Sequence, residues 1–251
     1  MTWDDKAAVF RNLHSQSAPL VLFNAWDAGS AKTIAKAGAK AIATGSWSVA
    51  AAQGYDDGED CPLDLVLGII QRIVESVDVP VSADFEGGYA GAPEEVAAHV
   101  LRLVQTGVVG LNFEDRVVSG RGLHSIADQT ARIRAIRSAC EAEGKDVFLN
   151  ARTDLFFGGV RDVAQEDLVQ MAIERGHAYH EAGASGLFVP GLLDPEALAQ
   201  IAEAVTLPLN AMSGSSAAPE ADLLGSGIAR LSYGPLPYMA VMKSLRGMAQ
   251  V

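Results

Sequence analysis

The sequence predicts an α/β protein of the (β/α)8 type, a TIM barrel of eight parallel strands. Eight short apolar runs recur along the chain, and each is followed by a polar turn and a segment with helical periodicity. The runs are almost continuously apolar rather than alternating, which is typical of strands buried on both faces of a parallel sheet. Eight such units in 251 residues match the size of one barrel.

The expected strands follow one another at intervals along the whole chain. They comprise residues 19–25, 40–46, 79–85, 109–115, 146–152, 185–191, 207–212 and 229–234. A glycine ends several of the intervening helices, as at Gly38, Gly107 and Gly183, a position that suits a helix C-terminus. An open doubly wound sheet is the main alternative, but no glycine-rich fingerprint follows the first strand. No linker divides the chain, so we expect residues 1–251 to form a single barrel domain.

The composition restricts the partners of this protein. A formal net charge of −12 argues against binding to nucleic acid or to an anionic membrane. The longest apolar run, near residues 65–70, is too short for a membrane span. Two cysteines are too few for a disulfide framework, and the N-terminus lacks the basic and apolar regions of a signal peptide, so we expect a cytoplasmic protein. A small anionic substrate remains compatible with the charge, because a metal or an arginine can reverse the field inside a cleft.

Acidic residues recur where expected strands end, or in the loops that follow them. They are Asp57, Asp84, Glu86 and Glu114, and the strand ending in NARTD adds Arg152. In a barrel the C-terminal strand ends form one mouth, so these side chains should converge. Like charges at close range raise one another's pKa, and a divalent cation is the simplest compensation. Ligands that are all oxygen favour Mg²⁺, with Mn²⁺ as the alternative.

Each of these residues also has a structural explanation. The three acids Asp84, Glu86 and Glu114 could be helix caps or partners in strand-end salt bridges, and Asp57 could belong to a solvated acidic turn. Arg152 could pair with a core acid. Asn210, at the end of the seventh expected strand, is a candidate for substrate contact on position alone.

Six segments between about residue 19 and residue 235 carry a resemblance to a known family. They are residues 23–59, SADFEGGYAG (82–91), LNFEDR (111–116), NARTD (150–154), GLFVPG (186–191) and LPLNAM (207–212). In this order and spacing they resemble the isocitrate lyase/phosphoenolpyruvate mutase superfamily. Each motif is weak alone, and the set indicates the superfamily without specifying the reaction.

The resemblance implies roles for particular residues. Asp84 would bind Mg²⁺ directly, and Glu86, Glu114 and Asp57 would hold it mainly through water. The turn of Gly45, Ser46 and Trp47 would receive the substrate carboxylate on its amides. Arg152 would meet a 2-oxo acid and its developing negative charge, so Arg152, Asp57 and Glu114 are the expected catalytic residues.

The implied activity is that of a Mg²⁺-dependent carbon–carbon lyase. It would cleave, or decarboxylate, next to the carbonyl or carbinol of a small 2-oxo or 2-hydroxy carboxylate. Cleavage leaves an enolate, an oxyanion absent from the ground state, which a Lewis-acidic metal and an arginine stabilise.

One region departs from the family pattern. Carbon–carbon lyases of the superfamily carry a cysteine in the loop after the fourth strand, whereas residues 114–129 here contain none. A decarboxylase, or a lyase that protonates its enolate differently, fits this difference better. Decarboxylation of oxaloacetate is the first expectation, because it needs no acid from that cysteine; His124 and Arg121 are the titratable replacements in the loop. Two alternatives stay open: an enzyme acting on a phosphorus–carbon bond, of the phosphonopyruvate hydrolase or mutase type, with Arg116 and Arg121 near the phosphonate, and a non-catalytic binder of 2-oxo acids.

The last expected helix, residues 238–251, bears on assembly. The resemblance implies a homodimer or homotetramer in which the final helices are exchanged. The apolar residues Met239, Met242 and Leu245 form a stripe that suits such an exchange, and equally suits packing within one barrel.

Overall fold

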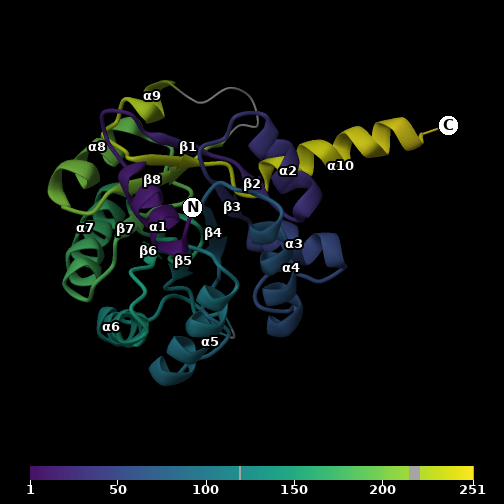
Figure 1. Ribbon diagram of the computed structural model, residues 1–251. Coiled ribbons are helices and arrows are strands. Elements are labelled where there is room, and N and C mark those ends of the chain that lie inside the picture. The colour runs from purple at the N-terminus through teal and green to yellow at the C-terminus, as the bar shows by residue number, and fades with distance from the viewer. Residues whose placement is uncertain (119, 215–220, 251) are drawn as a thin grey trace.

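The computed structural model describes residues 1–118, 120–214 and 221–250. Its parallel strands and surrounding helices alternate along the chain (Figure 1). The strands are β1 (Leu20–Leu22), β2 (Asn24–Ala25), β3 (Ile42–Thr44), β4 (Val81–Asp84), β5 (Gly110–Glu114), β6 (Phe148–Arg152), β7 (Gly186–Phe188), β8 (Leu209–Met212) and β9 (Arg230–Ser232). The helices are α1 (Trp3–Asn12), α2 (Ala28–Lys36), α3 (Ser46–Gln53), α4 (Leu63–Glu75), α5 (Pro93–Gln105), α6 (Ile126–Ala142), the 3-10 turn η1 (Asp154–Phe156), α7 (Gln165–Glu181), α8 (Pro195–Ala204), α9 (Ala221–Leu224) and α10 (Leu236–Ala249).

The sheet is a nearly closed parallel barrel, which confirms the predicted fold class. Its strand order is β1-β9-β8-β7-β6-β5-β4-β3-β2. The first predicted strand is divided at Phe23 into β1, which pairs with β9, and β2, which pairs with β3. Eight predicted strands therefore become nine, and the divided one brings the two edges of the sheet together.

The helices form where the apolar periodicity predicts them. On α5 the side chains of Val96, Val100, Leu103 and Val104 are all buried. The glycines after α2, α5 and α7 have φ values of +94°, +97° and +101°, which lie in the left-handed region that ends a helix. Among the described residues, no helix combines the length and the apolar character needed to cross a bilayer.

The N-terminal helix α1 closes the bottom of the barrel. Its Phe10 is fully buried against Leu22, Val109 and Phe148. The strand above has a glycine at this point, because a Cβ on Gly110 would lie 2.7 Å from the Phe10 ring. The mouth at the other end is left open for the loops that follow the strands.

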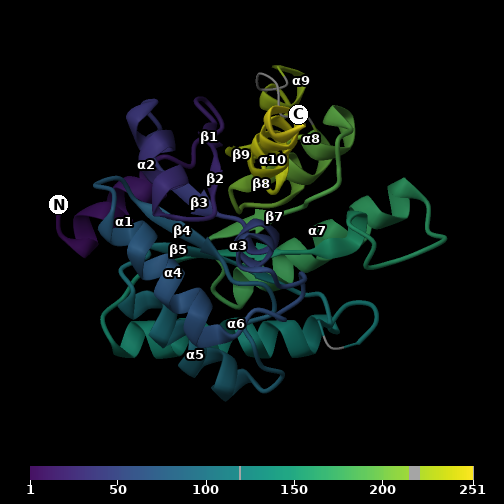
Figure 2. The same ribbon diagram turned by 90° about the vertical axis from the view of Figure 1, so that its right-hand side faces the viewer.

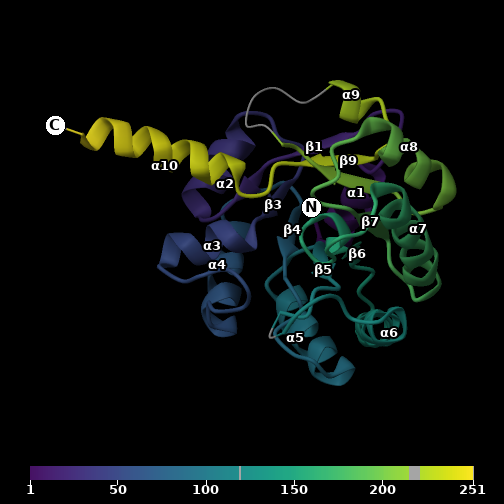
Figure 3. The same cartoon turned by 180° about the vertical axis from the view of Figure 1, so that it is seen from behind.

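The last helix, α10, projects away from the barrel, as Figures 1 and 3 show. None of its side chains is buried, and Met239 and Leu245 are about half exposed, at 50% and 51%. Its first turn contacts the barrel, where Tyr238 meets the rings of Trp26 and Trp47 edge-on at 5.2 and 5.8 Å. The interpretation that the apolar stripe packs into the core of its own barrel is therefore wrong.

Replacing Gly191 with alanine should destabilise the fold. This glycine follows β7 with φ +88°, and an added Cβ would collide with the carbonyl oxygen of Phe156. Left-handed strain together with a backbone clash should lower the free energy of unfolding by about 2 kcal/mol or more. Urea denaturation measures the change.

Gly68 provides the matched control for this substitution. It lies inside α4, has no positive φ, and has open space where a Cβ would be placed. Alanine there should raise stability by about 0.5–1 kcal/mol. If Gly191→Ala raised the free energy of unfolding as Gly68→Ala does, the loop after β7 would have to relax around the new methyl group.

Candidate active site

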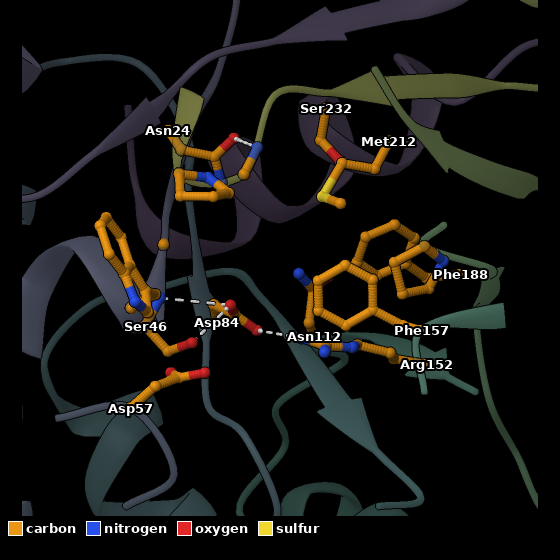
Figure 4. Close-up of a pocket in the computed structure, with 15 residues that line it drawn as sticks. Asn24, Ser46, Asp57, Asp84, Asn112, Arg152, Phe157, Phe188, Met212 and Ser232 are labelled. Carbon is orange, nitrogen blue, oxygen red and sulfur yellow. Dashed lines mark hydrogen bonds and ion pairs between the residues drawn. The ribbon is translucent and has the colours of Figure 1, made fainter. Parts of the chain in front are cut away.

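A cavity of about 260 Å³ opens at the C-terminal ends of the strands (Figure 4). Figure 2 shows the barrel turned by 90°, with α3 and α10 toward the viewer. The cavity is lined by Asn24, Gly45, Ser46, Trp47, Asp57, Asp84, Asn112, Arg152, Phe157, Phe188, Pro190, Met212, Ser232, Gly234 and Pro235. Its three charged residues, Asp57, Asp84 and Arg152, were all predicted from the sequence.

Asp84 ends β4 with one carboxylate oxygen held and the other free. Its Oδ2 accepts hydrogen bonds from the amide and the hydroxyl of Ser46, at 3.2 and 2.9 Å. Its backbone amide donates to Oγ1 of Thr44 at 3.0 Å, which fixes the strand end. Its Oδ1 is buried and makes no hydrogen bond to any described residue, and Nη1 of Arg152 lies 4.0 Å away.

Arg152 ends β6 among three carboxylates. It is paired in register with Glu114 of β5, and its Nη1 lies 3.0 Å from Oε2 of Glu114. Its Nε and Nη2 donate to both oxygens of the buried Asp154, at 2.6 and 2.9 Å. The guanidinium also lies 5.5 Å from the ring of Phe157 and 5.9 Å from that of Phe188. Asp154 thus fixes the plane of the guanidinium, a structural role that a bidentate pair performs well.

A second cavity of about 200 Å³ adjoins the first on its acidic side. Its lining comprises Ser46, Asp57, Gly58, Glu86, Glu114, Arg116, Val118 and Arg152. Ser46, Asp57 and Arg152 line both cavities, so the site has an acidic lobe and a larger lobe with aromatic and aliphatic walls. The structure thus brings together Asp57, Asp84, Glu86, Glu114 and Arg152 from four separate parts of the chain.

Glu86 joins the two loops that carry the acids. Its Oε2 accepts from the amides of Gly58 and Glu59 at 2.9 and 2.8 Å. In return, the carboxylate of Glu59 accepts from the amide of Tyr89 at 2.7 Å. Glu59, Glu86 and Tyr89 all have positive φ values, a strain that these crossed hydrogen bonds offset. The crossing fixes the position of Asp57, which lies next to Gly58.

The electrostatics of the acidic lobe favour a cation. Burial, followed by repulsion from Asp57 and Asp84, raises the pKa of Glu86 to about 7. Burial also raises the pKa of Glu114, against the opposing effect of Arg152. The pKa of Asp57 is raised by burial and then by Asp84. A bound cation would favour the ionised form of all three groups.

The residues present fit a hard divalent cation. The orphaned Oδ1 of Asp84 is an unfavourable buried acceptor until a cation or water satisfies it. In the part of the chain that the structure describes, no three acidic, histidine or cysteine side chains form a ready-made metal cage. One direct oxygen ligand with more distant carboxylates is the kind of set that Mg²⁺ accepts, because this ion keeps much of its water shell.

The turn of Gly45, Ser46 and Trp47 begins α3 and faces the cavity. The amide of Gly45 donates to the carbonyl of Ala25 at 3.3 Å, and the amide of Ser46 donates to Asp84. The amide of Trp47 lies in the first turn, where helical amides have no partner within the helix. The helix N-terminus therefore presents a donor and a partial positive charge to an anion in the cavity.

Asn210 lies away from the cavity wall. It is buried inside the barrel, where its Nδ2 donates to the carbonyl of Ala211 at 2.6 Å and its Oδ1 accepts from Asn150 at 3.0 Å. Direct substrate contact by Asn210, expected from its strand-end position, does not follow from this geometry.

Several lining residues were not identified from the sequence. Asn112 stands two positions before Glu114, and the two-residue period of a strand could have placed it on the same face. Phe188 ends β7, and Met212 and Ser232 end β8 and β9. Phe157 follows η1, so no strand pattern indicates it.

The cysteine-free loop lies at the rim of the acidic lobe. Arg116 forms an antiparallel bridge with Leu123 and lines the acidic lobe. His124 lines a different cavity beside Tyr89 and Arg132, and burial lowers its pKa. Arg121 is exposed and lines neither lobe. Of the polar residues expected to act from this loop, Arg116 alone reaches the site.

Fold and site together define an α/β-barrel enzyme of the lyase and mutase type. The family model described as phosphoenolpyruvate phosphomutase matches residues 10–251. The chain therefore belongs to the phosphoenolpyruvate mutase family, within the isocitrate lyase/phosphoenolpyruvate mutase superfamily that the sequence motifs indicated.

Three known proteins illustrate the range of this family. The structure of a candidate phosphonomutase from Burkholderia cenocepacia J2315 is similar with a TM-score of 0.94, at 43% identity and over 99% of both chains. The 2-methylisocitrate lyase of Escherichia coli (strain K12) is 31% identical over 83% of this chain and 70% of its own length. An oxaloacetate decarboxylase of Pseudomonas savastanoi pv. phaseolicola is 32% identical over 69% of this chain and 58% of its own length.

Proposed function

We propose that this protein is a Mg²⁺-dependent lyase of small 2-oxo acids, and that decarboxylation of oxaloacetate is its reaction. The observation that carries the proposal is Oδ1 of Asp84, which is buried, accepts no hydrogen bond from any described residue and lies 4.0 Å from Nη1 of Arg152. A metal bound to this oxygen would satisfy it, and a 2-oxo acid between the metal and the guanidinium of Arg152 would give the guanidinium an anionic partner.

The chain offers one direct metal ligand and three supporting acids. Asp84 would bind Mg²⁺, and Asp57, Glu86 and Glu114, which line the acidic lobe, would hold its waters. When bound, the metal supplies Lewis acidity at the substrate carbonyl. Mn²⁺ should substitute, because it accepts the same oxygen ligands.

The protein's own groups bind and orient the substrate. The N-terminus of α3, with the Trp47 amide, would receive the C1 carboxylate. Arg152, held in plane by Asp154, would stabilise the oxyanion that forms at C2. Breaking the C3–C4 bond releases CO₂, its electron pair forms the enolate of pyruvate, and a proton from water then adds at C3.

The larger lobe suits the departing carboxylate. Phe157, Phe188, Pro190 and Met212 line it, and its only cationic side chain among the described residues is Arg152. A carboxylate with few hydrogen-bond donors around it is poorly solvated, which favours its loss as neutral CO₂. Neither cysteine lines this lobe, so no thiol acid serves the reaction there.

Pyruvate release from oxaloacetate and from 2-methylisocitrate, with and without Mg²⁺, tests the proposal. We expect Mg²⁺-dependent turnover of oxaloacetate well above the metal-catalysed background, and little or no turnover of 2-methylisocitrate. Turnover of neither substrate would refute a lyase of this class. Preferred cleavage of 2-methylisocitrate would instead require a general acid that replaces the missing cysteine.

A second candidate is chemistry on a phosphorus–carbon bond, favoured by the 43% identity to a candidate phosphonomutase. A phosphonate would need cationic or amide groups beyond the 2-oxo acid, and Arg116, which lines the acidic lobe beside Arg152, could supply one. Phosphorus NMR of phosphonopyruvate incubated with the protein separates the candidates, since phosphate or a rearranged product appears only in the second. Binding of oxalate and Mg²⁺ with no turnover of any of these substrates would indicate a non-catalytic binder of 2-oxo acids.

The proposal includes a homodimer or homotetramer in a cytoplasmic setting. An exposed α10 with apolar side chains is unfavourable in water, and exchange of this helix with a second copy would bury it. Tyr238, at the start of α10, contacts Trp47 at the site, so exchange would support the cavity wall.

Changing Leu245 to aspartate should release monomers. A charge in a buried apolar interface opposes association, and light scattering measures the resulting mass. Ser244→Asp, with the same charge on the neighbouring exposed position, is the control and should leave the assembly intact. A monomeric wild-type protein would contradict helix exchange.

A further inference from the structure

Three asparagines form a chain of hydrogen bonds across the interior of the barrel. Asn210 lies on β8, Asn150 on β6 and Asn112 on β5, and each is at most 4% exposed. The Nδ2 of Asn150 donates in both directions, to Oδ1 of Asn210 at 3.0 Å and to Oδ1 of Asn112 at 2.9 Å. We call these three residues the asparagine relay.

Backbone carbonyls fix the direction of the relay at its far end. The Nδ2 of Asn210 lies 2.6 Å from the carbonyl of Ala211 and 3.2 Å from that of Arg230. A carbonyl only accepts, so the nitrogen of Asn210 must face these groups and its oxygen must face Asn150. The oxygen of Asn210 in turn requires the nitrogen of Asn150, which leaves the oxygen of Asn112 as the next acceptor.

Two further features hold the relay in place. The fully buried Arg230 has its Nη2 3.5 Å from Oδ1 of Asn112, and a guanidinium can only donate. Gly186 lies on β7, between the strands of Asn150 and Asn210, and a Cβ there would lie 2.7 Å from Oδ1 of Asn150. The glycine therefore leaves the space through which Asn150 reaches across β7.

The relay determines which end of Asn112 faces the cavity. Its Oδ1 is committed to Asn150 and Arg230, and no described residue accepts a hydrogen bond from its Nδ2. Asn112 lines the main cavity together with Asp84 and Arg152, and Figure 4 shows the three side chains at this cavity. A neutral donor therefore faces the same cavity as the Asp84 carboxylate and the Arg152 guanidinium.

We propose that Asn112 is a substrate-contacting residue whose Nδ2 donates to a carboxylate or enolate oxygen of the 2-oxo acid. Asn150 and Asn210 are then positioning residues that keep this nitrogen pointing into the cavity. This inference rests on the proposed function and deepens it. A donor whose orientation is set beforehand stabilises an oxyanion without reorganisation during the reaction. Asn210 therefore acts two side chains away from the substrate rather than in contact with it.

Asn112→Asp tests the contact by changing one nitrogen to oxygen. The new carboxylate can still accept from Asn150 and Arg230, but it presents an acceptor to the anionic ligand. Titration calorimetry with oxalate, a planar analogue of a 2-oxo acid, in excess Mg²⁺ should show binding at least tenfold weaker than for wild type. Asn12→Asp makes the same change on the exposed end of α1 and should bind oxalate as wild type does. Asn112→Ala gives the same comparison if the aspartate variant does not fold.

A double-mutant cycle tests the positioning role. Asn150→Ala should weaken oxalate binding several-fold in the wild-type background, because Oδ1 of Asn112 then keeps only the longer, 3.5 Å contact with Arg230 and its amide is less firmly oriented. In the Asn112→Ala background the same change should have little further effect, since no amide remains to be oriented. Equal losses in both backgrounds would show that Asn150 acts only through general stability, and would overturn its positioning role.

The outcomes distinguish this inference from the proposed function. Wild-type protein that binds oxalate with Mg²⁺, while Asn112→Asp and Asn112→Ala bind it equally well, overturns the contact alone. Wild-type protein that neither binds oxalate nor releases pyruvate from oxaloacetate overturns both.

Discussion

Asp84→Asn should abolish Mg²⁺-dependent turnover and at the same time stabilise the metal-free protein. The amide oxygen can still accept from Ser46, whereas the unpartnered Oδ1 is replaced by a group that cannot bind a cation. Loss of a metal contact worth about 4 kcal/mol in the transition state lowers kcat/KM about a thousandfold. Removing the charge of Asp84 also relieves its repulsion with Asp57 and Glu86, so the melting temperature without Mg²⁺ should rise.

Pyruvate release from oxaloacetate measures the loss of turnover, and thermal unfolding with and without Mg²⁺ measures the change in stability. Wild-type protein should melt at a higher temperature when Mg²⁺ is added, and Asp84→Asn should not respond. Asp64→Asn removes the same charge from an exposed ion pair with Arg102, so it should keep the activity and the Mg²⁺ response. A persistent Mg²⁺ shift in Asp84→Asn would place the metal on other acids.

Arg152→Lys should lose both activity and stability. A single ammonium group cannot replace the two-point contact with Asp154 and also reach Glu114, because lysine lacks the planar fork of arginine. The fully buried Asp154 would then lack part of its compensation, and unfolding should become easier by about 1–3 kcal/mol. Turnover should fall about a hundredfold or more, because the donor to the oxyanion moves out of position.

Arg137→Lys separates these two effects. Arg137 is also largely buried, and it binds the carbonyls of Val147 and Gly183 and the hydroxyl of Ser185 on the outside of the barrel. Its replacement should lower stability with unchanged kcat and KM for the folded protein. An Arg152→Lys variant with the same profile would show that Arg152 supports the fold without acting on substrate.

The barrel could be predicted because each of its parts is a local property of the chain. A parallel strand buried on both faces requires a nearly continuous apolar run, and residues such as 185–191 supply it. The helix ends were predicted for the same reason, since the left-handed φ at Gly38, Gly107 and Gly183 is a property of the glycine itself. The division of the first strand at Phe23 was not predicted, because it depends on which two strands meet when the barrel closes.

The projection of α10 was left open for a related reason. An apolar stripe at helical spacing looks the same whether it packs on its own core or on a second copy. The sequence does not show whether the last helix lies against its own barrel. The structure shows Met239 and Leu245 half exposed, which removes one of the two interpretations.

At the site, the sequence by itself determined which charges gather. Acids at strand ends converge at one mouth of a barrel, so Asp57, Asp84, Glu86, Glu114 and Arg152 could be grouped before any coordinates. The tertiary structure alone decided what each group is free to do. Glu86 accepts from the amides of Gly58 and Glu59, and one oxygen of Asp84 accepts no hydrogen bond from the described residues. Asn112 lines the cavity, whereas Asn210 does not. The physical reason is that charge is carried by the residue type, whereas the direction of a hydrogen bond depends on partners that only the folded chain brings together.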